Sequence, residues 1–137
     1  MFERILLAVD GSEHSRRAVP VAAELAFRHG GEVLVFHVRE HEAALGVDVD
    51  AETPREALDL VDGVVRELKD LGVGVRGEIV RVPLGQTPRA ILDAATDEGM
   101  DLIVLGTRGL SDWSRLLVGS VAHKVVHLAH IPVLVVR

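Results

Sequence analysis

The chain contains no cysteine. It therefore has no disulfide framework, no thiolate nucleophile and no zinc site built on sulfur. It is also short of basic side chains, because 15 Lys and Arg stand against 21 Asp and Glu and give a formal net charge of −6. Nucleic-acid binding is driven largely by Lys and Arg that neutralise phosphates. This balance argues against a nucleic-acid partner.

Long apolar runs are absent too, and none approaches the ~20 residues that a helix needs to cross a bilayer. The first ten residues, MFERILLAVD, contain two acids and no small-residue cleavage site, so they do not resemble a signal peptide. We therefore expect a soluble, cytoplasmic protein without membrane contacts. The 137 residues, of which 48% are apolar types, predict one domain, 1–137, with a real hydrophobic core.

Four apolar runs, at residues 4–10, 32–38, 101–106 and 131–136, are predicted to be strands. They are almost continuously apolar rather than alternating, which is typical of strands covered on both faces in a parallel sheet. A fifth run, residues 73–82, alternates more and is expected to lie towards an edge of the sheet.

Helical patterns separate these strands. Thr53 followed by proline and then Glu56 forms a capping box, and apolar residues at steps of three and four follow it. Thr87 is expected to open the next helix in the same way. The other two helices are predicted from Ser12–Ser15 to about His29, and from about Gly119 to His130. We expect residues 40–52, which show no clear pattern, to be a surface loop.

The predicted order is therefore β-α-β-α-β-α-β-α-β. Regular alternation with crossovers of this length predicts an α/β fold, a doubly wound sheet with helices on both faces.

One glycine motif is misleading. Gly72, Gly74 and Gly77 match the G-x-G-x-x-G spacing of dinucleotide-binding proteins. That motif is meaningful where it follows a strand and opens a helix, whereas here it follows a helix and enters a strand. We interpret it as a glycine-rich helix stop.

A second glycine set follows the strand at 101–106 and opens the last helix. Ligands of doubly wound sheets bind outside the carboxyl ends of the strands, where the strand order reverses. Glycines there let a backbone approach a bulky anion, and a helix N-terminus and two arginines attract it. The alternative, a flexible loop with helix-capping glycines, remains open. The set comprises Gly106, Arg108, Gly109, Arg115, Gly119 and Ser120.

Asp10 ends the first strand and is expected at the same crevice. Its carboxylate suits a ribose hydroxyl or a Mg²⁺ ion that bridges phosphates. The alternative is that Asp10 or Ser12 caps the following helix.

At these residues the chain resembles the nucleotide-binding subgroup of the universal stress protein family. Gly106, Gly109, Gly119 and Ser120 fill the subgroup's pattern G-x₂-G-x₉-G-[ST] without a gap. The opening ILLAVDGSEHSRRA and the ending GSVAHKVVHLAHIPVLVVR resemble the family as well. The resemblance implies a five-stranded parallel sheet of order 3-2-1-4-5 that holds ATP, ADP or AMP.

The resemblance also implies a role for each matching position. Ala8 and Asp10 would line the ribose side, and the backbone of Val38 would meet the adenine. The residues that would surround the phosphates are Gly106, Arg108, Gly109, Gly119, Ser120 and Val121.

Several residues allow more than one interpretation. His123, His127 and His130 share one helix face; we favour a role at the negative helix end over a metal site. For His37 we favour a packed strand histidine over a ligand contact. Trp113 would cover the site or anchor its loop.

The leading functional hypothesis is a nucleotide-binding module that acts as a stress-response switch. The alternative is a slow ATPase or phosphotransferase at the same site. Arg108, Arg115 and Asp10 would supply the charge clamps and the metal ligand. Asp112 is the nearest candidate for a residue that positions water. The apolar strand at 131–136 would lie on a sheet edge and is expected to pair with a second copy in a homodimer.

Overall fold

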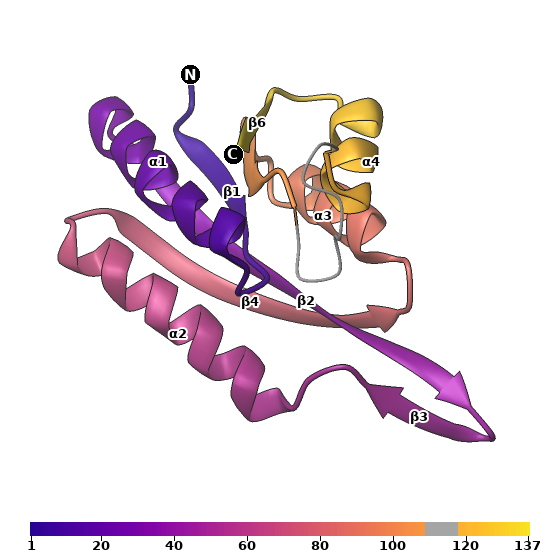
Figure 1. The fold of residues 1–137 in the computed structure, drawn as a ribbon. Coiled ribbons are helices and arrows are strands. Elements are labelled where there is room, and N and C mark those ends of the chain that lie inside the picture. The colour runs from indigo at the N-terminus through magenta and orange to yellow at the C-terminus, as the bar shows by residue number, and fades with distance from the viewer. Residues whose placement is uncertain (109–117) are drawn as a thin grey trace.

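The computed structural model describes residues 1–108 and 118–137 (Figure 1). Strands and helices alternate along the chain, as the apolar runs predict. In chain order they are β1 (Arg4–Ala8), α1 (Glu13–His29), β2 (Glu32–Ala44), β3 (Val47–Asp50), α2 (Pro54–Asp70), β4 (Gly74–Pro83), α3 (Thr87–Asp97), β5 (Leu102–Gly106), α4 (Ser120–Leu128) and β6 (Val133–Val136).

The strands of the sheet are parallel except for β3. β1 pairs with β2 on one side and with β5 on the other, β4 lies outside β2, and β6 lies outside β5. The parallel strands therefore follow the spatial order β4-β2-β1-β5-β6. Counted along the chain without β3, this is the expected order 3-2-1-4-5, and β4 lies at an edge of this parallel array as its alternating pattern predicts. The expected number of five strands is wrong, because β3 adds a sixth strand that pairs antiparallel with β2.

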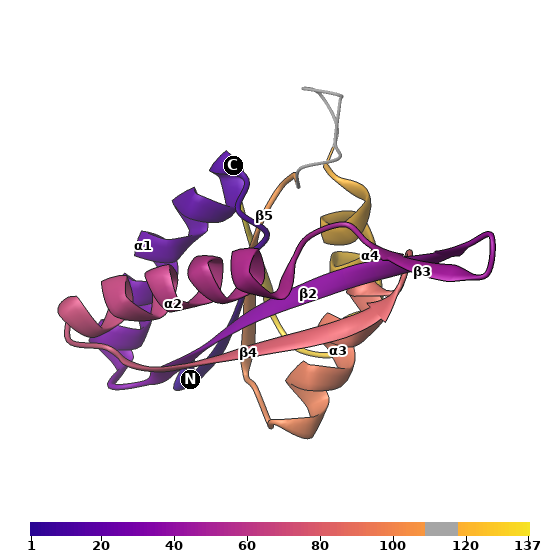
Figure 2. The same ribbon diagram turned by 90° about the horizontal axis from the view of Figure 1, so that it is seen from below.

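Helices cover both faces of the sheet (Figures 1 and 2). α1 and α2 pack on the face that carries Ile5 and Leu7 of β1. α3 and α4 pack on the other face, which carries Leu6. The side chains of Ile5, Leu6 and Leu7 are each 0% exposed. The central strand is therefore buried from both sides and forms the middle of the core.

The helix ends follow the local sequence with two corrections. Ser12 caps α1, which ends at Gly30 with a φ of +64°, and the capping box of Thr53 and Glu56 is fully formed. Thr87, expected to be a cap, is the first residue of α3. α4 ends at Leu128 rather than near His130, since the backbone is already extended at Ala129.

The expected surface loop at residues 40–52 is instead a β-hairpin. β2 continues to Ala44 and pairs antiparallel with β3 through a two-residue turn, in which Leu45 and Gly46 have φ values of +51° and +78°. Two positive φ values are typical of the tight turn that matches strand twist. The alternation Val-Asp-Val-Asp in β3 was the available signal for this strand. Both views show the hairpin extending away from the rest of the molecule (Figures 1 and 2).

The G-x-G-x-x-G segment has a structural role, as its context predicts. Gly72 follows the end of α2 with a φ of +80° and stops the helix. At Gly77 a Cβ atom would lie 2.4 Å from Cγ1 of Val61 and 3.2 Å from Cγ2 of Val65. This glycine therefore allows α2 to pack closely on β4.

Within residues 1–108 and 118–137, no helix combines the length and the apolar character needed to span a bilayer.

Replacement of Gly77 by alanine is expected to destabilise the protein. The new methyl group would overlap the buried Val61 side chain, and overpacking of this kind costs about 1–3 kcal/mol of unfolding free energy. Urea unfolding measures this change. Gly63→Ala is the matched control: a Cβ atom at this exposed glycine inside α2 would meet no atom within 4 Å, so alanine should stabilise by roughly 0.5–1 kcal/mol. A Gly77→Ala protein as stable as the original would contradict the packing argument.

Candidate functional site

A cleft opens at the carboxyl ends of β1 and β5, where the strand order reverses. It encloses about 500 Å³ of free space, its open mouth included. Its walls come from three strands and three helices: Ala8, Val9, Asp10, Ser15, Phe36, Val38, Thr87, Ile91, Leu105, Gly106, Arg108, Val121 and Ala122.

Most of the residues predicted for the site line this cleft. Ala8, Asp10, Val38, Gly106, Arg108 and Val121 all contribute to its wall. Gly119 and Ser120 lie directly before Val121, at the start of α4. Gly109 lies outside the described residues, as do Asp112, Trp113 and Arg115.

One part of the wall is apolar. Phe36 and Val38 come from β2, and Ile91 of α3 and Leu105 of β5 pack in the same core cluster. Thr87 adds a hydroxyl group from the first turn of α3. The sequence analysis did not predict Phe36, Thr87, Ile91 and Leu105 as site residues. A signal was available for Thr87, because it begins the helix that follows the carboxyl end of β4.

Asp10 and Ser12 form a hydrogen-bonded turn between β1 and α1. The hydroxyl of Ser12 accepts from the Ser15 N–H as the helix cap, and it donates to the carbonyl of Arg108 at 3.2 Å. Asp10 Oδ1 accepts the Ser12 N–H at 2.9 Å, and the Asp10 N–H donates to Ser15 Oγ. Ser12 is thus the cap, and Asp10 supports the turn while also lining the cleft.

Gly106 is required for the close packing of α1 beside the end of β5. A Cβ atom there would lie 2.6 Å from the carbonyl carbon of His14 and 2.7 Å from the backbone N of Ser15. These are backbone atoms of the first turn of α1, which cannot move as a flexible side chain can. The glycine lets α1 begin directly beside the end of β5 and so shapes the cleft.

Arg108 brings positive charge to the wall of the cleft. Its Nε atom is buried and has no hydrogen-bond partner within the part of the chain that the structure describes. A buried donor without a partner costs free energy, and an anionic ligand in the cleft would satisfy it.

The N-terminus of α4 lies at the cleft, since Val121 and Ala122 line it. Gly119 is the N-cap residue, and its N–H donates to the Thr107 carbonyl at 2.5 Å. No side-chain hydrogen bond caps this helix among the described residues. The N–H groups of Ser120, Val121 and Ala122 therefore have no partner within the helix and carry the positive end of its dipole.

None of the histidines, all of which lie within the described residues, lines the cleft. His37 is 4% exposed and packed, as expected. The rings of His123 and His127 stack with centroids 6.4 Å apart on α4. Across residues 1–108 and 118–137 no group of three or more His, Asp or Glu side chains is arranged to hold a metal ion.

A second hollow lies between α3 and α4. It encloses about 710 Å³ on the same measure, but its lining includes no Asp, Glu, Lys or Arg. The first cleft is smaller and combines an apolar wall with a carboxylate, a guanidinium and free helix N–H groups. A few polar groups that converge on a mainly apolar lining are typical of small-molecule sites.

Comparison with known proteins places this site in a family context. The whole chain, residues 1–137, matches the model of the Universal stress protein family. A universal stress protein of Thermus aquaticus, named for its position in the QAH/OAS sulfhydrylase 3′ region, is 43% identical over the full length of both chains.

Two solved structures are also similar. MJ0577 of Methanocaldococcus jannaschii is 26% identical with a TM-score of 0.81, over 99% of this chain and 96% of that one. A universal stress protein from Archaeoglobus fulgidus in complex with dAMP is 25% identical with a TM-score of 0.77, over 98% and 97% of the two chains.

Gly106→Ala tests the close approach of α1 to β5. The methyl group would overlap fixed backbone atoms, so we expect a loss of about 1–3 kcal/mol or more of unfolding free energy in urea. Gly74→Ala is the matched strand control, because its nearest contact would be an ordinary 3.7 Å to Cβ of Glu32. Equal stability of the two variants would rule out this role for Gly106.

Proposed function

Because the chain belongs to the universal stress protein family, we propose that its cleft binds an adenine nucleotide (ATP, ADP or AMP) and that the protein acts as a cytoplasmic switch in the stress response. One observation carries this proposal. Within the described residues, the uncapped N-terminus of α4 and the unpartnered Nε of Arg108 converge on a cleft whose remaining wall is largely apolar. A nucleotide has matching parts, an anionic phosphate chain and an aromatic base.

The apolar wall suits the adenine ring. Phe36 and Val38 of β2 and Ile91 of α3 offer side chains for packing against a flat base, and the backbone of Val38 is the group expected to meet it. Ala8 is small and leaves room at the ribose position, where the Asp10 carboxylate can accept a hydrogen bond from a hydroxyl group.

The opposite end suits phosphates. The N–H groups of Ser120 and Val121 and the helix dipole favour negative charge, and Arg108 adds a formal positive charge. Gly106, Gly109 and Gly119 would keep the surrounding backbone free of side chains. The net charge of −6 does not oppose this, because the field at the site is set by the nearest groups.

Asp10 is the residue that would hold Mg²⁺. Oδ1 accepts the Ser12 N–H, and the carboxylate lines the cleft together with the arginine. A bound Mg²⁺ would neutralise phosphate charge and fix the conformation of the chain of phosphates. Asp112, the residue considered for positioning water, lies outside the described residues. The function that we propose is nucleotide binding.

The complex of the Archaeoglobus fulgidus relative with dAMP supports an adenine nucleotide as ligand class. That relative shares the fold over nearly the whole chain.

We also propose that two copies associate through β6. This strand pairs with β5 on one side, and within the described part of the chain no strand pairs with its other side. Its residues are apolar and partly exposed, with Leu134 at 36%. An apolar edge with free backbone groups favours pairing with another strand.

Ser120→Glu separates ligand binding from folding. A glutamate in the first turn of α4 would place a negative charge where phosphate is proposed, and we expect ATP affinity in calorimetric titration to fall by about tenfold or more. The same charge favours the helix by about 0.3–1 kcal/mol, so stability in urea should not fall.

Ser120→Gln, which has a similar size and no charge, is the control and should retain most of the affinity. Unchanged ATP affinity in Ser120→Glu would show that the phosphates do not bind at α4. Absence of heat with ATP, ADP and AMP for the unmodified protein would overturn the proposed function.

The proposed dimer is tested by sedimentation. The chain has a mass of 14.8 kDa, and we expect a species of twice that mass at micromolar concentration. Leu134→Lys should shift it to the monomer, because a charge on the strand opposes burial of the edge. A 14.8 kDa species for the unmodified protein would rule out the dimer.

A further inference from the structure

The N-cap residue of α1 makes a hydrogen bond that capping does not require. An N-cap side chain needs only to accept a backbone N–H, and the hydroxyl of Ser12 accepts that of Ser15. Its single proton is then free for a second partner. Ser12 donates this proton to the carbonyl oxygen of Arg108 at 3.2 Å, 96 residues further along the chain. The bond joins the turn after β1 to the segment after β5.

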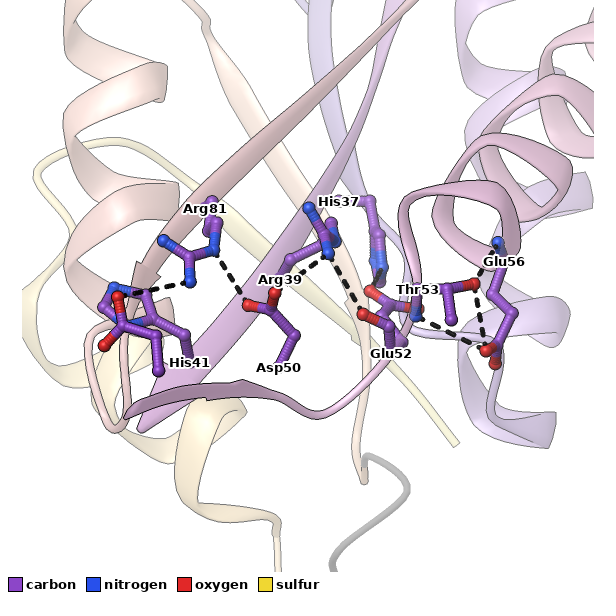
Figure 3. Close-up of polar contacts among 9 residues, drawn as sticks. His37, Arg39, His41, Asp50, Glu52, Thr53, Glu56 and Arg81 are labelled. Atoms are coloured by element: carbon purple, nitrogen blue, oxygen red, sulfur yellow. Dashed lines mark hydrogen bonds and ion pairs between the residues drawn. The ribbon is translucent and has the colours of Figure 1, made fainter. Parts of the chain in front are cut away.

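The N-cap residue of α2, Thr53, uses its hydroxyl in a different way. It accepts from the N–H of Glu56 at 3.1 Å and donates to Oε1 of the same residue, so both bonds stay within the capping box (Figure 3). Figure 3 shows Thr53 beside the contact between His37 and Glu52, in a row of polar groups along the base of the hairpin. Thr53 does not line the cleft. The two caps therefore have the same local role, and the one at Ser12 also reaches the cleft.

The backbone of residues 107 and 108 is held by three different elements. The Thr107 N–H donates to the carbonyl of Val136 in β6 at 2.8 Å, and the Thr107 carbonyl accepts from Gly119 at the start of α4. The Arg108 carbonyl accepts from Ser12 at the start of α1. Successive peptide groups are thus tied to β6, α4 and α1. The bond from Ser12 completes this junction at the residue that carries the guanidinium of the cleft.

Ser12 does not line the cleft, whereas Asp10 and Arg108 both do. Its backbone N–H holds Oδ1 of Asp10 at 2.9 Å, and its hydroxyl holds the backbone of Arg108. One residue therefore connects the group proposed for the ribose with the group proposed for the phosphates. A side-chain substitution at Ser12 removes the second connection and keeps the first, because every residue except proline retains the backbone N–H.

We propose that Ser12 is a positioning residue for the nucleotide, and that its hydroxyl orders the backbone of Arg108 before the ligand binds. This inference rests on the proposed function. A segment that is ordered in advance raises affinity, because its conformational entropy is not lost on binding. The Nε of Arg108 is buried and has no hydrogen-bond partner among the described residues, so a donor on this side chain is available to the anion.

The test is the ATP affinity of the full chain, measured by calorimetry in matched variants. Ser12→Ala removes the hydroxyl, and we expect the affinity to fall by about three- to tenfold, the range for one hydrogen bond. Ser12→Thr keeps a hydroxyl that can accept and donate, and it should retain most of the affinity. Thr53→Ala is the control: it also removes a cap and should lower stability in urea by a similar amount, without changing the ATP affinity.

Two results of this comparison would overturn the positioning role. The first is an ATP affinity of Ser12→Ala equal to that of the unmodified protein. The second is an equal loss of affinity in Ser12→Ala and Thr53→Ala, since the effect would then follow from the loss of any helix cap.

A second readout needs no nucleotide and separates failure of this inference from failure of the proposed function. The carbonyl ¹³C chemical shift of Arg108 in the ligand-free protein responds to the hydrogen bond at its oxygen. It should change in Ser12→Ala and stay unchanged in Ser12→Thr and Thr53→Ala. An unchanged shift in Ser12→Ala would rule out the bond even if ATP binds. The expected change without any ATP binding would confirm the bond and contradict the nucleotide proposal.

Discussion

The structure depends on the burial of β1 between β2 and β5. Ile5, Leu6 and Leu7 are fully buried and divide their contacts between the two helical layers, while parallel hydrogen bonds tie the strand on both sides. The chain leaves this strand towards one face through α1 and returns to its other side through α3 and β5. Because the crossovers from β1 and β5 lie on different faces, the helices of the described residues leave the carboxyl ends of these two strands open. The cleft is a direct consequence of that arrangement.

The chemistry of the cleft follows from the strands that end and the helix that begins beside it. The turn after β1 supplies Asp10, the end of β5 supplies Arg108, and α4 begins with N–H groups that have no partner within the helix. The apolar wall is part of the hydrophobic core itself, since Phe36 and Ile91 belong to both. A ligand with an aromatic and an anionic end would thus complete the core on one side and accept hydrogen bonds from Arg108 and the start of α4 on the other. The acidic character of the whole chain has no bearing on this local balance.

Much of this arrangement could be predicted from the sequence, because strands buried on both faces are continuously apolar and helix caps are local signals. The family resemblance correctly implied the strand order, and Ala8, Asp10, Val38, Gly106, Arg108 and Val121 do meet at one cleft. The hairpin was missed because its two-residue turn, Leu45-Gly46, carries only a weak signal. The role of Gly106 depends on where α1 begins, and the bond between His37 and Glu52 joins side chains 15 residues apart; neither is encoded locally.

The central claim is that an adenine nucleotide binds at the carboxyl ends of β1 and β5. Backbone amide NMR spectra recorded during a titration with ATP test both the binding and its location. The account predicts saturable shifts concentrated at Ala8, Val38, Arg108 and the first turn of α4, with little change at the hollow between α3 and α4 around Thr96 and Leu128. Saturable shifts centred on that second hollow, or no shifts at all, would contradict it.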